Sequence, residues 1–172
     1  MHARTTLALL ALGVAACAPS RPTGGPPAEN APVTARNEHV VAGLAFAVPA
    51  GYTLKSSTEE KVAGPIPGAP PTVEHFRRFE DGAGHGLHFF AWEGTPVRDR
   101  GPMAVAEKWD ATVGGEKATV SLTSTFFGRQ QQVLVAHFAG PAPRSNRYMI
   151  YTTQVDKPAF TALLASVRFV AR

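Results

Sequence analysis

The chain has 172 residues, of which 44% are hydrophobic, and 17 lysines and arginines against 13 aspartates and glutamates give a formal net charge of +4. Beyond the N-terminal stretch no apolar run approaches the ~18 residues of a transmembrane helix, and no basic block favours nucleic-acid binding. The single cysteine, Cys17, excludes an intrachain disulfide and a zinc site built from several cysteines.

The N-terminal stretch is typical of a secretory signal peptide. His2 and Arg4 make a short positive start, and Leu7 to Ala16 is apolar. About ten apolar residues are too few to cross a ~30 Å hydrocarbon core as a helix, but they suit the apolar region of a signal peptide. We therefore expect the protein to be exported.

The run Val14-Ala15-Ala16-Cys17 resembles the lipobox of bacterial lipoproteins. The resemblance implies that residues 1–16 are removed and that Cys17 carries lipid, such as palmitate, that anchors the protein in a membrane. An ordinary signal peptide cut elsewhere remains the alternative. The expected location is the bacterial cell envelope, and Ala18 favours the periplasmic face of the outer membrane over the inner membrane, by the rule that enterobacteria follow.

A tether and one domain follow the signal. Residues 17–37 are rich in proline and contain the pair Gly24-Gly25, so they have little to bury and are expected to form a flexible tether. The remainder, residues 38–172, has the size of one domain. We expect a single globular domain held near a membrane.

The first part of this domain is rich in strand patterns. His39–Val41 and Leu44–Val48 are short apolar runs around Gly43, and residues 64–71 form a proline-rich loop. Residues 72–79 and 87–93 predict a hairpin around Asp81 to Gly84. Both hairpin strands carry apolar residues at both alternations, which indicates a sheet covered on both faces.

Residues 102–113 predict a helix. Pro102 suits a first helical turn, Val105, Trp109 and Val113 recur every four residues, and Gly114-Gly115 would end the helix.

The last third predicts three more strands and a final helix. Residues 118–127 and 130–138 alternate on either side of Gly128-Arg129, which predicts a type II′ hairpin turn, and residues 147–155 form the next strand. Asp156 can cap the start of a helix. Its apolar residues recur at helical spacing and form one stripe, namely Phe160, Leu163, Leu164 and Val167. The order of elements predicts an α+β fold, an antiparallel β-sheet flanked by helices.

The run Phe46-Ala47-Val48-Pro49-Ala50-Gly51-Tyr52 resembles the opening motif of PsbP-like domains, with Tyr52 in place of the usual tryptophan. The closing segment from Phe160 to Phe169 is also similar, so the resemblance covers residues 38–170. It implies a PsbP-like α/β/α sandwich, like that of DcrB-like periplasmic lipoproteins. Other family members are chaperones or accessory subunits of membrane complexes, and the family shares no catalytic residues.

Two groups of side chains are candidate sites. His75, His85 and His88 lie on or beside the predicted hairpin and could converge on zinc or copper; surface or packed histidines are the alternative, and we expect no metal or other cofactor. At the later hairpin, Phe126, Phe127 and Arg129 flank the turn, where an exposed ring could contact a partner.

No catalytic motif is present in the sequence, so no catalytic residues are assigned. The sequence therefore favours a non-enzymatic accessory or binding lipoprotein beside an envelope membrane protein complex. The alternatives are a periplasmic metal- or small-ligand-binding protein and an enzyme with an unrecognised site.

Overall fold

The computed structural model describes residues 37–64, 66–94, 103–142 and 146–171. The predicted signal peptide and the tether as far as residue 36 lie outside these ranges, as does Pro102. Within them the chain forms one helix and ten strands, namely β1 (Glu38–Val41), β2 (Leu44–Ala47), β3 (Thr53–Val62), β4 (Thr72–Glu80), β5 (Gly86–Glu93), β6 (Ala104–Val113), β7 (Glu116–Phe126), β8 (Arg129–Ala139), β9 (Arg147–Thr152), α1 (Lys157–Ser166) and β10 (Arg168–Phe169).

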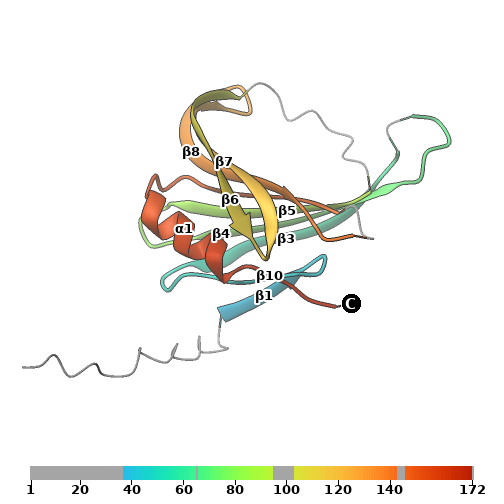
Figure 1. Ribbon diagram of the computed structural model, residues 1–172, viewed down its shortest axis with the longest axis horizontal. Helices are drawn as coiled ribbons and strands as arrows, with labels where there is room; N and C mark the ends of the chain where they lie inside the picture. Colours follow the sequence, from blue (N-terminus) through green and yellow to red (C-terminus); the bar gives the residue numbers. More distant parts are fainter. Residues whose placement is uncertain (1–36, 65, 95–102, 143–145, 172) are drawn as a thin grey trace, which may run out of the picture. The chain divides into compact units, whose positions relative to one another are not determined.

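The strands form two antiparallel sheets. The small sheet has the order β1-β2-β10, and the large sheet has the order β3-β4-β5-β9-β8-β7-β6. Figure 1 shows the small sheet and α1 on one side of the large sheet, while β7 and β8 bend away from the plane of β3, β4 and β5. The large sheet is therefore strongly curved.

The predicted α+β fold, with a sheet flanked by helices in a PsbP-like sandwich, is wrong. Among the described residues 61% are in strands and 9% are helical, and α1 is the one α-helix. The main core is covered by the small sheet together with α1, and the residues of both pack against the large sheet.

The predicted helix at residues 102–113 is wrong as well, because residues 104–113 form strand β6. A spacing of four residues places side chains on one face of a helix, but it also places them on one face of a strand. The structure follows the second pattern, since Trp109, Ala111 and Val113 face the core at every second position. Pairing with β7 along the length of the strand supplies the backbone hydrogen bonds.

The main core lies between the large sheet and its two covering elements. Phe46 of β2 is fully buried and stacks on Phe89 of β5, with ring centroids 3.6 Å apart and planes 9° apart. Phe79 of β4 meets both rings edge to face. These contacts join the two sheets.

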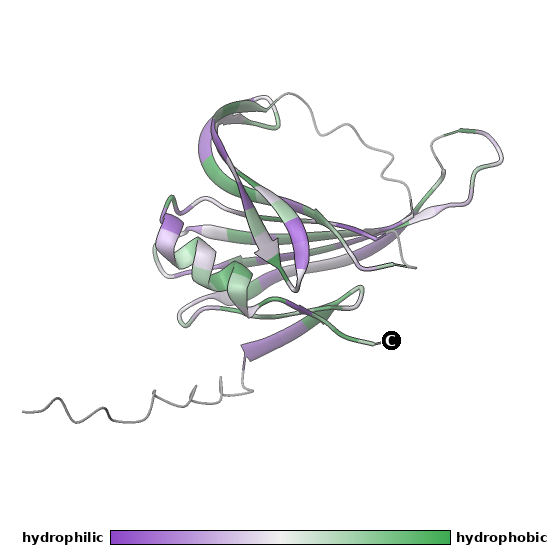
Figure 2. Ribbon diagram, in the orientation of Figure 1, coloured by the Kyte–Doolittle hydropathy of each residue, from purple (hydrophilic) through white to green (hydrophobic). Residues whose placement is uncertain are grey.

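Helix α1 forms as the sequence predicts. The Asp156 side chain accepts a hydrogen bond from the Ala159 backbone N–H at 3.0 Å, and Pro158 lies in the first turn. Beyond Lys157 most of the helix is hydrophobic (Figure 2), and Phe160, Leu163 and Leu164 are buried. No helix in the described ranges is both long and apolar enough to cross a bilayer.

Replacing Phe46 with alanine should lower the free energy of unfolding by about 3–5 kcal/mol, because it removes a fully buried ring and leaves a cavity between the sheets. Val40→Ala on β1 is the control, since Val40 is 57% exposed and its truncation should cost less than about 1 kcal/mol. Urea unfolding of both variants measures the difference, and equal losses would contradict this account of the core.

Candidate functional site

The face of the large sheet that points away from the small sheet carries a second apolar cluster. Strand alternation places it opposite the main core, because neighbouring residues such as Phe89 and Phe90 point to opposite faces. We call it the aromatic face and define it by Phe76, His88, Phe90, Trp92, Met149 and Tyr151. Its buried centre consists of Trp92, Phe126, Val133, Val135 and Met149.

Four rings of this face, those of His88, Phe90, Trp92 and Tyr151, lie nearly parallel to one another, while the Phe76 ring is tilted against Phe90 by 38°. The His88 and Tyr151 rings stack with centroids 4.2 Å apart and planes 8° apart. Phe90 is stacked beside Trp92 at 5.7 Å and beside Tyr151 at 6.1 Å, and Phe76 approaches Phe90 to 4.6 Å. The result is a continuous aromatic surface that extends over β4, β5 and β9.

The tip of the β7–β8 hairpin packs on the same surface. Phe126 is buried and its ring lies 4.5 Å from that of Tyr151, while half-buried Phe127 stacks on Phe126 at 4.1 Å. Of the predicted partner-binding residues, Phe126 therefore lacks the exposure that a partner contact requires. Phe127 is half-buried and Arg129 is exposed, so a contact through these two residues stays a prediction.

The turn at this tip differs from the predicted type II′ turn. Phe126 pairs with Arg129, so the central residues are Phe127 and Gly128, and both have positive φ, 49° and 74°. Two positive φ angles are typical of a type I′ turn, which matches the right-handed twist of the strands. Phe127 thus adopts a backbone conformation that is unfavourable for a bulky residue.

Three buried polar side-chain atoms have no hydrogen-bond partner in the described structure, and all three belong to residues on the side of the aromatic face. They are His88 Nδ1, Thr123 Oγ1 and His137 Nε2. Cross-strand pairing places His88 beside Tyr151, Thr123 beside Val133 and His137 beside Met149. Each such atom costs about 1–3 kcal/mol, so their gathering on one face calls for an explanation.

His88 is held in an uncharged state. Its pKa is lowered to about 4, mainly by burial and further by the nearby Arg78 guanidinium, against a smaller opposing effect of Glu80. Gly86 makes room for the ring, because a Cβ at that position would lie 2.4 Å from His88 Nε2. The aromatic face therefore presents a neutral imidazole at neutral pH.

A shallow hollow of about 450 Å³ continues this face over β6, β7 and β8. Its polar lining consists of Asp110, Thr112, Lys117, Thr119 and His137. Burial lowers the pKa of His137, so this imidazole is also neutral at pH 7.

The three histidines proposed from the sequence do not come together. His75 points to the opposite face from His88 and lies between two carboxylates, with Nδ1 3.2 Å from Glu59 and Nε2 3.0 Å from Glu93. No group of His, Cys, Asp or Glu in the described residues is arranged to hold a metal.

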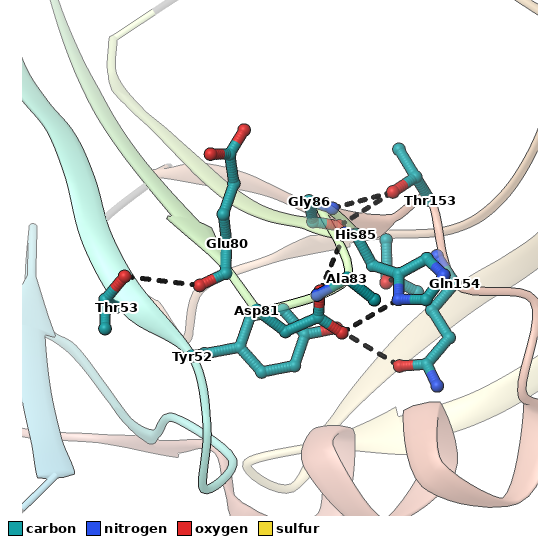
Figure 3. Close-up of polar contacts among 10 residues, drawn as sticks. Tyr52, Thr53, Glu80, Asp81, Ala83, His85, Gly86, Thr153 and Gln154 are labelled. Carbon is teal, nitrogen blue, oxygen red and sulfur yellow. Dashed lines mark hydrogen bonds and ion pairs between the residues drawn. The ribbon is translucent and has the colours of Figure 1, made fainter.

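His85 belongs to the β4–β5 turn, shown in Figure 3. The Asp81 carboxylate accepts hydrogen bonds from the backbone N–H groups of Ala83 and His85, and its second oxygen lies 2.8 Å from His85 Nδ1. These bonds lower the pKa of Asp81, led by the bond to the His85 ring. Thr153 bonds to the next residue, Gly86, which ties this turn to the end of β9. His85 thus has a structural explanation.

Sequence reasoning missed Thr123, His137 and the hollow. Their signal was weak, because Thr119, Ser121 and Thr123 alternate with apolar residues as they would in any half-exposed strand. The chain matches no protein-family model, no curated protein and no solved structure.

Phe126→Ala should lower the free energy of unfolding by about 3–5 kcal/mol, since the ring is buried. Phe127→Asn should change it by less than about 1 kcal/mol, because asparagine tolerates positive φ and the relief of backbone strain offsets the lost ring contacts. Chemical unfolding compares the two variants. A Phe127→Asn loss as large as that of Phe126→Ala would contradict the turn assignment.

The histidine pKa predicts a pH dependence of stability. His88 titrates near 6.5 when unfolded and at about 4 when folded, so between these values the unfolded state binds more protons. Stability should therefore fall as the pH drops from about 6.5 towards 4. His88→Phe should reduce the fall by about 2 kcal/mol. Urea unfolding of the unaltered protein and of His88→Phe at several pH values measures this difference in stability. Identical pH profiles would show that His88 is not buried as a neutral group.

Proposed function

We propose that this protein is a non-enzymatic, lipid-anchored binding protein of the bacterial cell envelope, and that the aromatic face is its binding surface. The observation that carries the proposal is the joint occurrence on one sheet face of a half-buried aromatic surface and three buried polar atoms without partners. Aromatic and apolar walls with a few polar groups are typical of ligand sites in proteins.

The anchor is supported by the lipobox resemblance of residues 14–17. A protein confined near a membrane meets membrane components and neighbouring envelope proteins at raised effective concentration, so even a weak site can be occupied. An accessory role beside a membrane protein complex is consistent with such a site, with Phe127 and Arg129 as candidate contacts at its edge.

Binding can be tested on the purified mature protein with N-phenyl-1-naphthylamine, an uncharged aromatic probe that fluoresces in apolar sites. Phe76→Ala should weaken probe binding at least fivefold, because Phe76 forms part of the surface and packs on Phe90. Leu54→Ala is the control, since Leu54 is exposed on the edge strand β3 and pairs with Phe79 on the other face. No saturable binding, or an equal effect of the two variants, would overturn the proposed site.

The anchor has its own test. Cys17→Ser should move the protein from the membrane fraction to the soluble fraction and remove a lipid-sized mass from the N-terminus of the mature chain. Fractionation and intact-mass measurement show this directly. Membrane retention with unchanged mass would overturn the lipoprotein assignment while leaving the binding face untouched.

A further inference from the structure

One row of cross-strand neighbours crosses the aromatic face and changes from aromatic to polar along its length. Register fixes its members, because each residue pairs with the next across adjacent antiparallel strands. From β4 to β6 the row contains Phe76, Phe90, Met149, His137, Thr119 and Asp110. One surface thus offers an apolar end on β4 and β5 and a polar end in the hollow on β6 to β8.

The polar end carries both signs of charge. Asp110 and Lys117 both line the hollow, so neither an anionic nor a cationic group is favoured there over the other. Thr112 and Thr119 add hydroxyl groups, which both donate and accept hydrogen bonds. This mixed set of donors and acceptors matches hydroxyl groups better than it matches a carboxylate, a phosphate or an ammonium group.

Among the residues that line the hollow, His137 has a buried ring nitrogen, Nε2, without a hydrogen-bond partner in the described structure, although the residue lies among polar neighbours. Burial also holds its pKa below the usual value, so the ring stays neutral. Because Nε2 is closed to solvent, the ring has to turn before a ligand in the hollow can form a hydrogen bond with this atom. Two further buried atoms, on His88 and Thr123, border the same face.

We propose that the aromatic face and the hollow together bind one uncharged membrane amphiphile, with its hydroxyl-bearing head in the hollow beside His137 and Thr119 and its apolar tail on Phe90 and Phe76. The inference rests on the proposed function, because the lipid anchor would place the domain beside its ligand. His137 and Phe90 lie two strands apart, about 10 Å, a separation that a medium-length alkyl chain covers.

Probes that share one chain length and differ in the head group test this directly. Binding of dodecyl maltoside, dodecanoate and dodecyltrimethylammonium to the mature protein is measured below each critical micelle concentration, by amide chemical-shift changes in NMR. Maltoside should bind at least fivefold more tightly than either charged probe, with shifts for the head group along β6, β7 and β8 and for the tail along β4, β5 and β9. Free maltose should bind far more weakly than the maltoside.

Matched variants locate the head group. Thr119→Val keeps the shape of the side chain and removes its hydroxyl, so it should weaken maltoside binding about tenfold and leave N-phenyl-1-naphthylamine binding unchanged. His137→Phe is the second variant, and it should also weaken maltoside binding about tenfold. Thr58→Val is the control, because Thr58 lies on the exposed strand β3 beside Phe76 and away from the hollow.

The outcomes separate this inference from the proposed function. Equal binding of the three head groups, tighter binding of a charged one, or full maltoside affinity in Thr119→Val would overturn the inference while probe binding to the aromatic face stands. Maltose that binds as tightly as the maltoside would show a sugar site without a lipid tail. Loss of all probe binding would overturn both proposals.

Discussion

The stack of Phe46 on Phe89 is the contact on which the rest of the structure depends. The small sheet has three strands, one of them only two residues long, and would not be stable alone. It becomes a layer of the fold because Phe46 stacks on Phe89 and meets Phe79 edge to face, both of the large sheet. Together with α1 it packs on one face of that sheet, and the other face carries a separate cluster of side chains.

The two faces of the large sheet differ in whether their buried polar side chains have hydrogen-bond partners. On the side of the small sheet Ile150, Leu134 and Phe46 are fully buried, and the buried polar side chains His75 and Thr152 have hydrogen-bond partners. The aromatic face mixes large rings with buried histidine and threonine. Stability alone would favour apolar residues there, since a buried polar atom without a partner costs free energy. Departures of this kind from a purely stabilising design are expected at functional sites, which is why we propose this face as the binding surface.

Curvature of the large sheet brings the tip of the β7–β8 hairpin onto the aromatic face. β7 and β8 bend away from the plane of β4 and β5 (Figure 1). The Phe126 ring at the hairpin tip lies 4.5 Å from that of Tyr151 on β9. The type I′ turn with Phe127 at positive φ contributes to this geometry by matching the strand twist. The hairpin tip is thus part of the wall of the candidate site.

The sequence alone was sufficient to predict the elements that are specified by residues close together in the chain. The cap at Asp156, the apolar stripe of α1 and the β4–β5 hairpin follow from side chains that act on their own backbone neighbourhood. The lipobox resemblance is local in the same sense, and it remains the basis for the proposed anchor. Strand β3, by contrast, is largely polar and exposed, and its sequence shows only a polar run.

Tertiary structure alone decided the elements whose local signals were ambiguous. Val105, Trp109 and Val113 satisfy helical and strand spacing equally, and pairing with β7 selected the strand. Register then placed His75 and His88 on opposite faces and brought His137 beside Met149, residues twelve apart in the chain. A shift of one residue in register exchanges the two faces of a strand. The candidate site therefore depends on long-range pairing that no local pattern in this sequence specifies.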